Sequence, residues 1–120
     1  MAVNKVAQRE IIEVPYQLPD GEIKPHMALV LSTQKLQDAE DGMFYAVLIS
    51  SKNLNPEFTI QIRSEWLSKP LPKKSYFVTH IVSYYRTDEV IQSFNNFVKA
   101  DYFDAIMNKV ILSMFDIELE

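Results

Sequence analysis

Cysteine is absent from the 120-residue sequence, and only two glycines and two histidines are present. Without cysteine the chain can form no disulfide, thiolate nucleophile or thiolate zinc site. Glycine occurs only as Gly21 and Gly42, which excludes glycine-rich phosphate loops and the Gly-x-Ser-x-Gly nucleophile motif. His26 and His80 lack carboxylates at ligand spacing, so we expect no metal site. The common signatures of catalysis are therefore missing.

Long hydrophobic runs are also missing. No apolar stretch approaches the roughly 18 residues that span a bilayer, and the first ten residues lack the apolar run of a signal peptide. We therefore expect a soluble, cytoplasmic protein with no membrane partner. The length of 120 residues and the 48% apolar composition predict a single globular domain over residues 1–120.

The net charge of −4 argues against a nucleic-acid partner, but the charge is unevenly distributed. Residues 61–100 carry six basic and three acidic side chains, whereas the segments on either side are acidic. Phosphate binding depends on a local basic surface, so this segment could bind RNA. Trp66 lies in it beside Arg63 and Lys69, where its ring could stack on a base or contact a partner. The alternative is that the lysines of this segment are ordinary solvated loop residues.

The hydrophobic pattern predicts a mainly β protein with a C-terminal helix. Tyr102, Phe103, Ile106, Val110 and Met114 recur at helical spacing, which predicts an amphipathic helix over 101–115 with Asp101 as its N-cap. Alternating or continuous apolar runs predict short antiparallel strands that form a small barrel. These strands are expected at residues 10–17, 27–33, 43–50, 58–63, 76–84 and 89–92.

The two histidines fall in different parts of this pattern. His26 lies in a polar loop predicted over residues 17–26, which Pro19, Gly21 and Pro25 interrupt. His80 lies inside the strand at 76–84, where we expect a packed, hydrogen-bonded side chain.

Four segments, in this order and spacing, resemble the MazF/PemK (Kid-like) family of type II toxins: Arg9–Tyr16, His26–Ser32, Leu48–Ser51 and Lys73–Val78. The resemblance covers roughly residues 9–115 and indicates a diverged member. His26 stands where the family has arginine, the proline that follows that arginine is replaced, and the opening Gly-Asp of the first strand is missing. The fold that the resemblance implies is a small antiparallel SH3-like barrel.

The resemblance also implies a function. The family cleaves single-stranded RNA by attack of the ribose 2′-OH on the adjacent phosphate, without a metal or another cofactor. Its members form homodimers that a small antitoxin protein neutralises. At the matching positions, His26 and Ser50 are the expected catalytic residues. The expected substrate-binding residues are Lys24, Ser51, Trp66, Lys73, Lys74 and Ser75.

The exchange of arginine for histidine changes the chemistry that position 26 can supply. Arginine is a fixed charge that forks onto phosphate oxygens, whereas histidine takes up and releases protons near neutral pH. Lys24, two residues earlier, could supply the missing fixed charge.

Two alternatives stay open on the sequence alone. The first is a catalytically inactive SH3-like barrel that binds protein or RNA, which the histidine at position 26 and the acidic total charge favour. The second is an unrelated small domain whose C-terminal helix serves as an oligomer contact.

Overall fold

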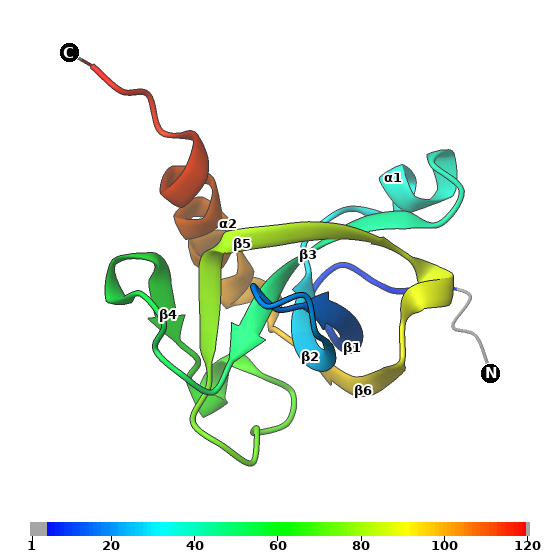
Figure 1. Cartoon of the computed structure of the whole chain (residues 1–120), viewed down its shortest axis with the longest axis horizontal. Coiled ribbons are helices and arrows are strands. Elements are labelled where there is room, and N and C mark those ends of the chain that lie inside the picture. Colours follow the sequence, from blue (N-terminus) through cyan, green and yellow to red (C-terminus); the bar gives the residue numbers. More distant parts are fainter. Residues whose placement is uncertain (1–4, 120) are drawn as a thin grey trace.

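The structure is a computed structural model that describes residues 5–119. A single sheet of six strands, all paired antiparallel in the order β4-β5-β3-β2-β1-β6, forms its centre (Figure 1). Its strands are β1 (Glu10–Gln17), β2 (Ile23–Val30), β3 (Met43–Ser50), β4 (Thr59–Gln61), β5 (Tyr76–Arg86) and β6 (Gln92–Phe97). Its helices are α1 (Gln34–Ala39), α2 (Ala100–Phe115) and the 3-10 turns η1 (Pro56–Phe58), η2 (Ser64–Trp66) and η3 (Thr87–Glu89).

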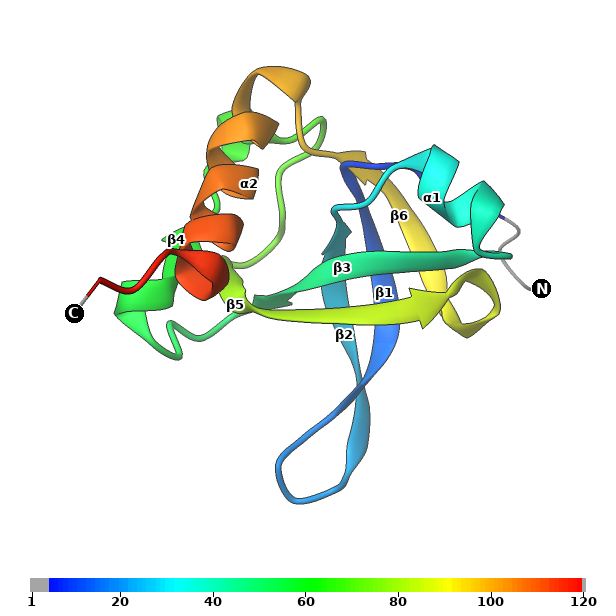
Figure 2. The same cartoon turned by 90° about the horizontal axis from the view of Figure 1, so that it is seen from above.

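This architecture confirms the predicted mainly β fold with a C-terminal helix. Helix α2 packs beside β4 and β5, and the hairpin of β1 and β2 projects from the sheet (Figure 2). The predicted domain of residues 1–120 includes residues 1–4 and 120, which lie outside the described residues. No helix within residues 5–119 is long and apolar enough to cross a membrane.

Buried side chains form a cluster on each face of the sheet. One strand can supply both clusters, because its successive side chains point to opposite sides. On β1, Ile11 belongs to a core cluster that α2 covers, whereas Ile12 and Val14 belong to a second cluster on the other face. Helix α2 contributes Phe103 and Ile106 to the first cluster. Fully burying each such side chain contributes about 1.5–3 kcal/mol. The predicted amphipathic helix is therefore what closes this face.

Several details differ from the prediction. Strand β2 ends at Val30 and not at residue 33, β4 is Thr59–Gln61 and not 58–63, and β5 continues to Arg86 and not to residue 84. Strand β2 begins at Ile23 and not at residue 27, and the last strand is Gln92–Phe97 and not 89–92. Strand β6 is irregular: Asn95 has a positive φ of 51°, and the pairing of β6 with β1 shifts register. An irregular strand of this kind has no simple alternation of apolar and polar residues in its sequence. Helix α2 has Lys99 as N-cap, and Asp101 lies in the first turn, where its charge still favours the helix.

A further difference concerns His80. Its ring packs on Phe58 with centroids 5.0 Å apart, but its buried Nδ1 has no hydrogen-bond partner within the described residues. His80 lies in a bulge of β5: consecutive β3 residues, Val47 and Leu48, pair with Val82 and Val78, so β5 residues 79–81 are left without partners on β3. His80 is thus packed as predicted, but the expected hydrogen bond is missing.

The buried phenol of Tyr85 makes the free energy of unfolding depend on pH in the alkaline range. Burial raises the pKa of its phenol above the ordinary value, although the side-chain hydrogen bond with Ser83 acts in the opposite direction. Above about pH 10 the unfolded chain loses this proton while the folded chain keeps it, so the free energy of unfolding falls as pH rises. We expect Tyr85→Phe to lose less stability than the wild type in denaturant unfolding between neutral pH and pH above about 10. Parallel losses in the two proteins would contradict this.

Candidate active site

A groove of about 670 Å³ lies where the β1–β2 hairpin, the end of β3 and the segment before β5 meet. These segments are distant in sequence, and the order β5-β3-β2-β1 of the sheet brings them together. Of the eight residues predicted to bind or cleave RNA, six line this groove: Lys24, His26, Ser50, Ser51, Lys73 and Ser75. The sheet therefore gathers most of the predicted site at one place.

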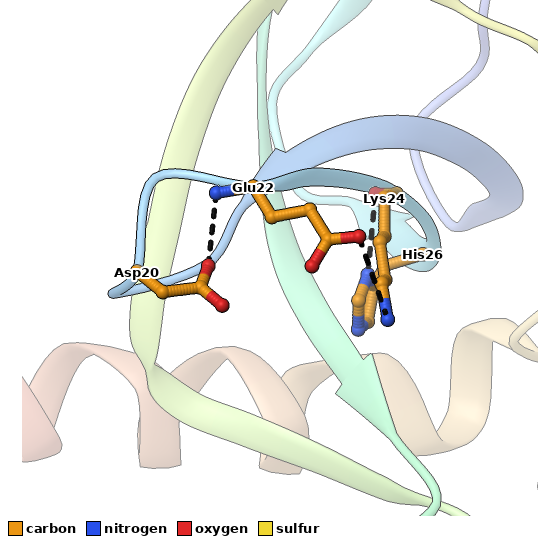
Figure 3. Close-up of polar contacts among 4 residues, drawn as sticks. All are labelled: Asp20, Glu22, Lys24 and His26. Atoms are coloured by element: carbon orange, nitrogen blue, oxygen red, sulfur yellow. Dashed lines mark hydrogen bonds and ion pairs between the residues drawn. The ribbon is translucent and has the colours of Figure 1, made fainter.

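His26 is held in strand β2 and not in a loop, because β2 starts at Ile23. It lies opposite Val14 of β1 and is half-buried, with its ring edge-on to the Tyr16 ring at a centroid distance of 5.2 Å. Its Nδ1 lies 3.3 Å from the carbonyl oxygen of Lys24 (Figure 3). A carbonyl only accepts, so this contact needs a proton on Nδ1. The Nε2 of the neutral ring is then free to accept a proton.

Lys24 brings a positive charge beside His26. Its Nζ lies 3.9 Å from a carboxylate oxygen of Glu22, and both side chains are more than half exposed (Figure 3). Such an exposed ion pair contributes little, so a phosphate can displace Glu22 at small cost. The turn of the hairpin does not depend on this ion pair, because Asp20 accepts a hydrogen bond of 2.9 Å from the backbone N–H of Glu22.

The three predicted serines differ in what their hydroxyls do. Ser50, at the end of β3, accepts a 3.1 Å bond from the backbone N–H of Lys52, which leaves its own hydrogen free to donate. Ser51 follows it and is exposed. Ser75 is buried, and its hydroxyl donates to the carbonyl of Lys73 at 3.0 Å. Ser50 is thus equipped to bind a phosphate oxygen, whereas Ser75 holds the basic segment in shape.

The remaining two predicted residues lie outside the groove. Lys74 lines a smaller pocket next to it. Trp66 is half-buried in η2, and its ring stacks on Tyr102 of α2 with centroids 6.0 Å apart and planes inclined by 29°. The structure therefore places Trp66 against the core and not on the groove.

Among the groove residues that were not foreseen, Glu13, Tyr16 and Lys52 carry polar groups that could contact a ligand. A hairpin centred on residue 20 puts Tyr16 opposite Lys24, so the turn at 19–21 would have located Tyr16. Lys52 directly follows the serine pair. The Glu13 carboxylate accepts a 3.2 Å bond from Gln92, the first residue of β6, and this contact between distant parts of the chain has no sequence signal.

The groove is locally basic although the chain is acidic. Lys24, Lys52 and Lys73 line it with exposed side chains, and Glu13 is the acidic residue among the described residues that line it. Lysine ammonium groups attract phosphate as point charges. Within residues 5–119, no group of three or more His, Asp or Glu side chains is placed to hold a metal ion.

Comparison with known proteins identifies the fold. The structure matches an endoribonuclease in complex with its cognate antitoxin from a Mycobacterial species with a TM-score of 0.64 and 14% identity, covering 98% of this chain and 99% of that one. It matches a MazE–MazF complex from Deinococcus radiodurans with a TM-score of 0.65 and 14% identity, covering 91% and 97%. MazF alone from that organism gives a TM-score of 0.64 at 14% identity, covering 92% of this chain and 98% of that chain.

The chain therefore has the MazF fold, which confirms the fold that the sequence resemblance implied. No protein-family model and no curated protein matches the sequence.

Proposed function

We propose that this chain is a toxin-like endoribonuclease that cleaves single-stranded RNA in the groove. The observation that carries the proposal is the convergence of His26, Ser50 and three lysines in one groove of a MazF fold. In the reaction, the ribose 2′-OH attacks the adjacent phosphorus and the bond to the 5′ oxygen of the next nucleotide breaks. The products are a cyclic phosphate and a free 5′-OH.

Each step has a side chain that suits it. His26 Nε2 takes the 2′ proton, and the resulting imidazolium can return it to the leaving oxygen. The Ser50 hydroxyl donates to a non-bridging phosphate oxygen, and Lys24 and Lys73 balance the charge that develops there. The proposed chemistry uses these side chains alone.

We also propose a small antitoxin protein and a second copy of the chain as partners, and the cytoplasm as the place of action. The neighbours that crystallised as complexes support the antitoxin. A row of exposed apolar side chains at the end of α2 and beyond it supports a protein contact: Ile111, Leu112, Phe115, Ile117 and Leu119.

The test is inducible expression in a bacterial host with mapping of RNA 5′ ends. Wild type and the control Lys35→Ala, which changes an exposed residue of α1, should arrest growth and create new 5′ ends. His26→Ala and Ser50→Ala should do neither. Normal growth and intact RNA with folded wild-type protein would contradict the proposal.

Ser50→Ala should lower the cleavage rate of purified protein by about 10²–10³-fold, the usual cost of removing one transition-state donor. Ser50→Thr, which keeps the hydroxyl, should retain activity. The alanine variant loses only the bond to the Lys52 N–H at an exposed turn, so the free energy of unfolding should change by less than about 1.5 kcal/mol. Equal rates for the alanine and threonine variants would contradict the role of the hydroxyl.

Lys73→Ala should weaken RNA binding equally for all sequences. Because each neutralised phosphate of a single strand contributes about 0.7 to the salt slope, the slope of log K against log salt should become shallower by about that amount. Lys35→Ala, a lysine on α1, should leave the slope unchanged. Fluorescence anisotropy with labelled RNA over a salt series measures both, and an unchanged slope for Lys73→Ala would place the phosphate elsewhere.

A binding module without cleavage is the second candidate. No arginine is among the described residues that line the groove, and lysines can bind phosphate without any reaction. This candidate predicts salt-dependent RNA binding with no new 5′ ends.

A further inference from the structure

The ring of Tyr16 lies against the imidazole of His26 in the wall of the groove. The two ring centroids are 5.2 Å apart and the ring planes are inclined by 65°. Both residues line the groove, and both are half-buried. Edge-to-face contacts of this kind stabilise a pair of rings beyond the burial of their surface, and they depend on how the rings are oriented. Tyr16 therefore restricts how the imidazole can turn.

The other contact of the imidazole is weak. His26 Nδ1 lies 3.3 Å from the carbonyl oxygen of Lys24, at an exposed position, which is longer than the roughly 2.9–3.0 Å of a typical hydrogen bond (Figure 3). A neutral imidazole can carry its proton on either nitrogen, and its ring torsion has a broad distribution. The proposed chemistry needs the proton on Nδ1 and a free Nε2. The contact with Lys24 alone is a poor guarantee of both.

Two prolines stiffen the backbone that carries the two rings. Tyr16 follows Pro15, and His26 follows Pro25. The two prolines lie opposite each other in the β1–β2 hairpin, and Tyr16 lies opposite Lys24. Proline fixes its own φ near about −65° and keeps the residue before it extended. The Tyr16 ring and the Lys24 carbonyl, which contact the two sides of the same imidazole, thus come from one pair of residues in a stiff part of the hairpin.

Tyr16 also has a neighbour on the core side. Tyr85 is buried and belongs to the second core cluster. Burial is the main cause that raises the pKa of Tyr85, and the charge of Tyr16 adds to it, so the two phenols lie near each other. Tyr16 therefore connects the rigid core to the imidazole in the groove.

We propose that Tyr16 is a positioning residue, which holds the His26 imidazole with its Nδ1 proton toward the Lys24 carbonyl and its Nε2 toward the RNA. Position 26 needs such a residue in this chain because it is a histidine. The arginine that the MazF resemblance implies there stays protonated and has no neutral tautomers to select between. The effect on catalysis rests on the proposed function, whereas the effect on the tautomer of His26 does not.

The first measurement is NMR of the full-length ¹⁵N-labelled protein at about pH 8, where histidine side chains are neutral. Long-range ¹H–¹⁵N correlations show which nitrogen of an imidazole carries the proton. We expect the proton of His26 on Nδ1, and NOEs between its ring and that of Tyr16, in the wild type. Tyr16→Phe keeps the ring and should preserve the tautomer, whereas Tyr16→Leu should give a mixture. His80, the other histidine, packs on Phe58 and should be unchanged in both variants, which shows that they are folded.

The second measurement is the rate of RNA cleavage. Tyr16→Leu should lower kcat about tenfold and change KM by less than about twofold, because a misplaced acid–base group slows the chemical step without weakening binding. Tyr16→Phe should keep the wild-type kcat. Tyr84→Leu is the matched control and should change neither constant, since Tyr84 is exposed and does not line the groove.

Each result decides between the two proposals. Missing NOEs between the rings in the wild type, or an unchanged His26 tautomer in Tyr16→Leu, would overturn the positioning role and leave the ribonuclease in place. A lower kcat with that unchanged tautomer would mean that Tyr16 acts on the RNA and not through His26. Equal losses in the phenylalanine and leucine variants would assign the effect to the hydroxyl and overturn the role of the ring. A changed tautomer in Tyr16→Leu, with no cleavage by the wild type, would support the positioning role and contradict the ribonuclease.

Discussion

His26→Ala should lower RNA cleavage by about 10²–10⁴-fold, the range that a positioned acid–base residue contributes. The reason is that Nδ1 is engaged with the Lys24 carbonyl, so Nε2 is the ring atom left to take the 2′ proton. Alanine has no group for this step. Single-turnover cleavage of a labelled RNA by the purified variants measures the loss directly.

Two further measurements separate proton transfer from charge and from folding. His26→Arg restores the fixed charge that the MazF resemblance implies but does not exchange protons near neutral pH. If proton transfer is the role of His26, His26→Arg should cleave no faster than His26→Ala, whereas recovery of cleavage by the arginine would show that the positive charge is what the position supplies. Unfolding curves for both variants control for the loss of the contact with Tyr16. Cleavage by His26→Ala at the wild-type rate would contradict the assignment.

The sequence predicts both ends of β1 and β3 and misplaces at least one end of each of the other strands. β1 and β3 were placed at residues 10–17 and 43–50, as observed, because apolar side chains run along each of them. β2 was begun too late, since its first part pairs only with β1 and pairs with β3 only from Ala28. An edge position of this kind tolerates Pro25, which had indicated a loop.

The site divides in the same way. His26 in β2, Ser50 at the end of β3 and Lys73 just before β5 were predicted from the resemblance to the MazF/PemK family, and all three line the groove. The place of Trp66 depends on α2, through the stack on Tyr102, and no local pattern contains that information. The segment around Lys69 is held by two hydrogen bonds to Asn96, which is far away in sequence. Long-range hydrogen bonds of single polar side chains leave no periodic signal.

Phe77→Ala should lower the free energy of unfolding by about 3–5 kcal/mol, the cost of emptying a fully buried aromatic site. Phe77 is 0% exposed, lies opposite Ile49 of β3 and Ile60 of β4, and belongs to the cluster that α2 covers. Strands on both sides hold the position, so the surrounding structure closes the cavity only in part. Urea unfolding followed by circular dichroism measures the change.

Tyr84→Ala is the matched control, since it removes an aromatic ring from the same strand. Tyr84 is 66% exposed and contacts Tyr45 edge-on at 6.3 Å, a pair that contributes at most about 1.5 kcal/mol. Equal losses in the two variants would contradict the assigned core.

The Phe77 substitution should also weaken RNA binding at temperatures where the variant is still folded. Ile49 pairs with Phe77 in the sheet, and Ser75 precedes Phe77 by two residues in the chain; both line the groove. Ser50 follows Ile49 directly. A cavity behind these residues lets the end of β3 shift toward it, which moves the Ser50 hydroxyl away from the phosphate. Tyr84 does not line the groove, so Tyr84→Ala should bind RNA as the wild type does. A loss of affinity in the first variant alone would connect the packing under the sheet to the geometry of the site above it.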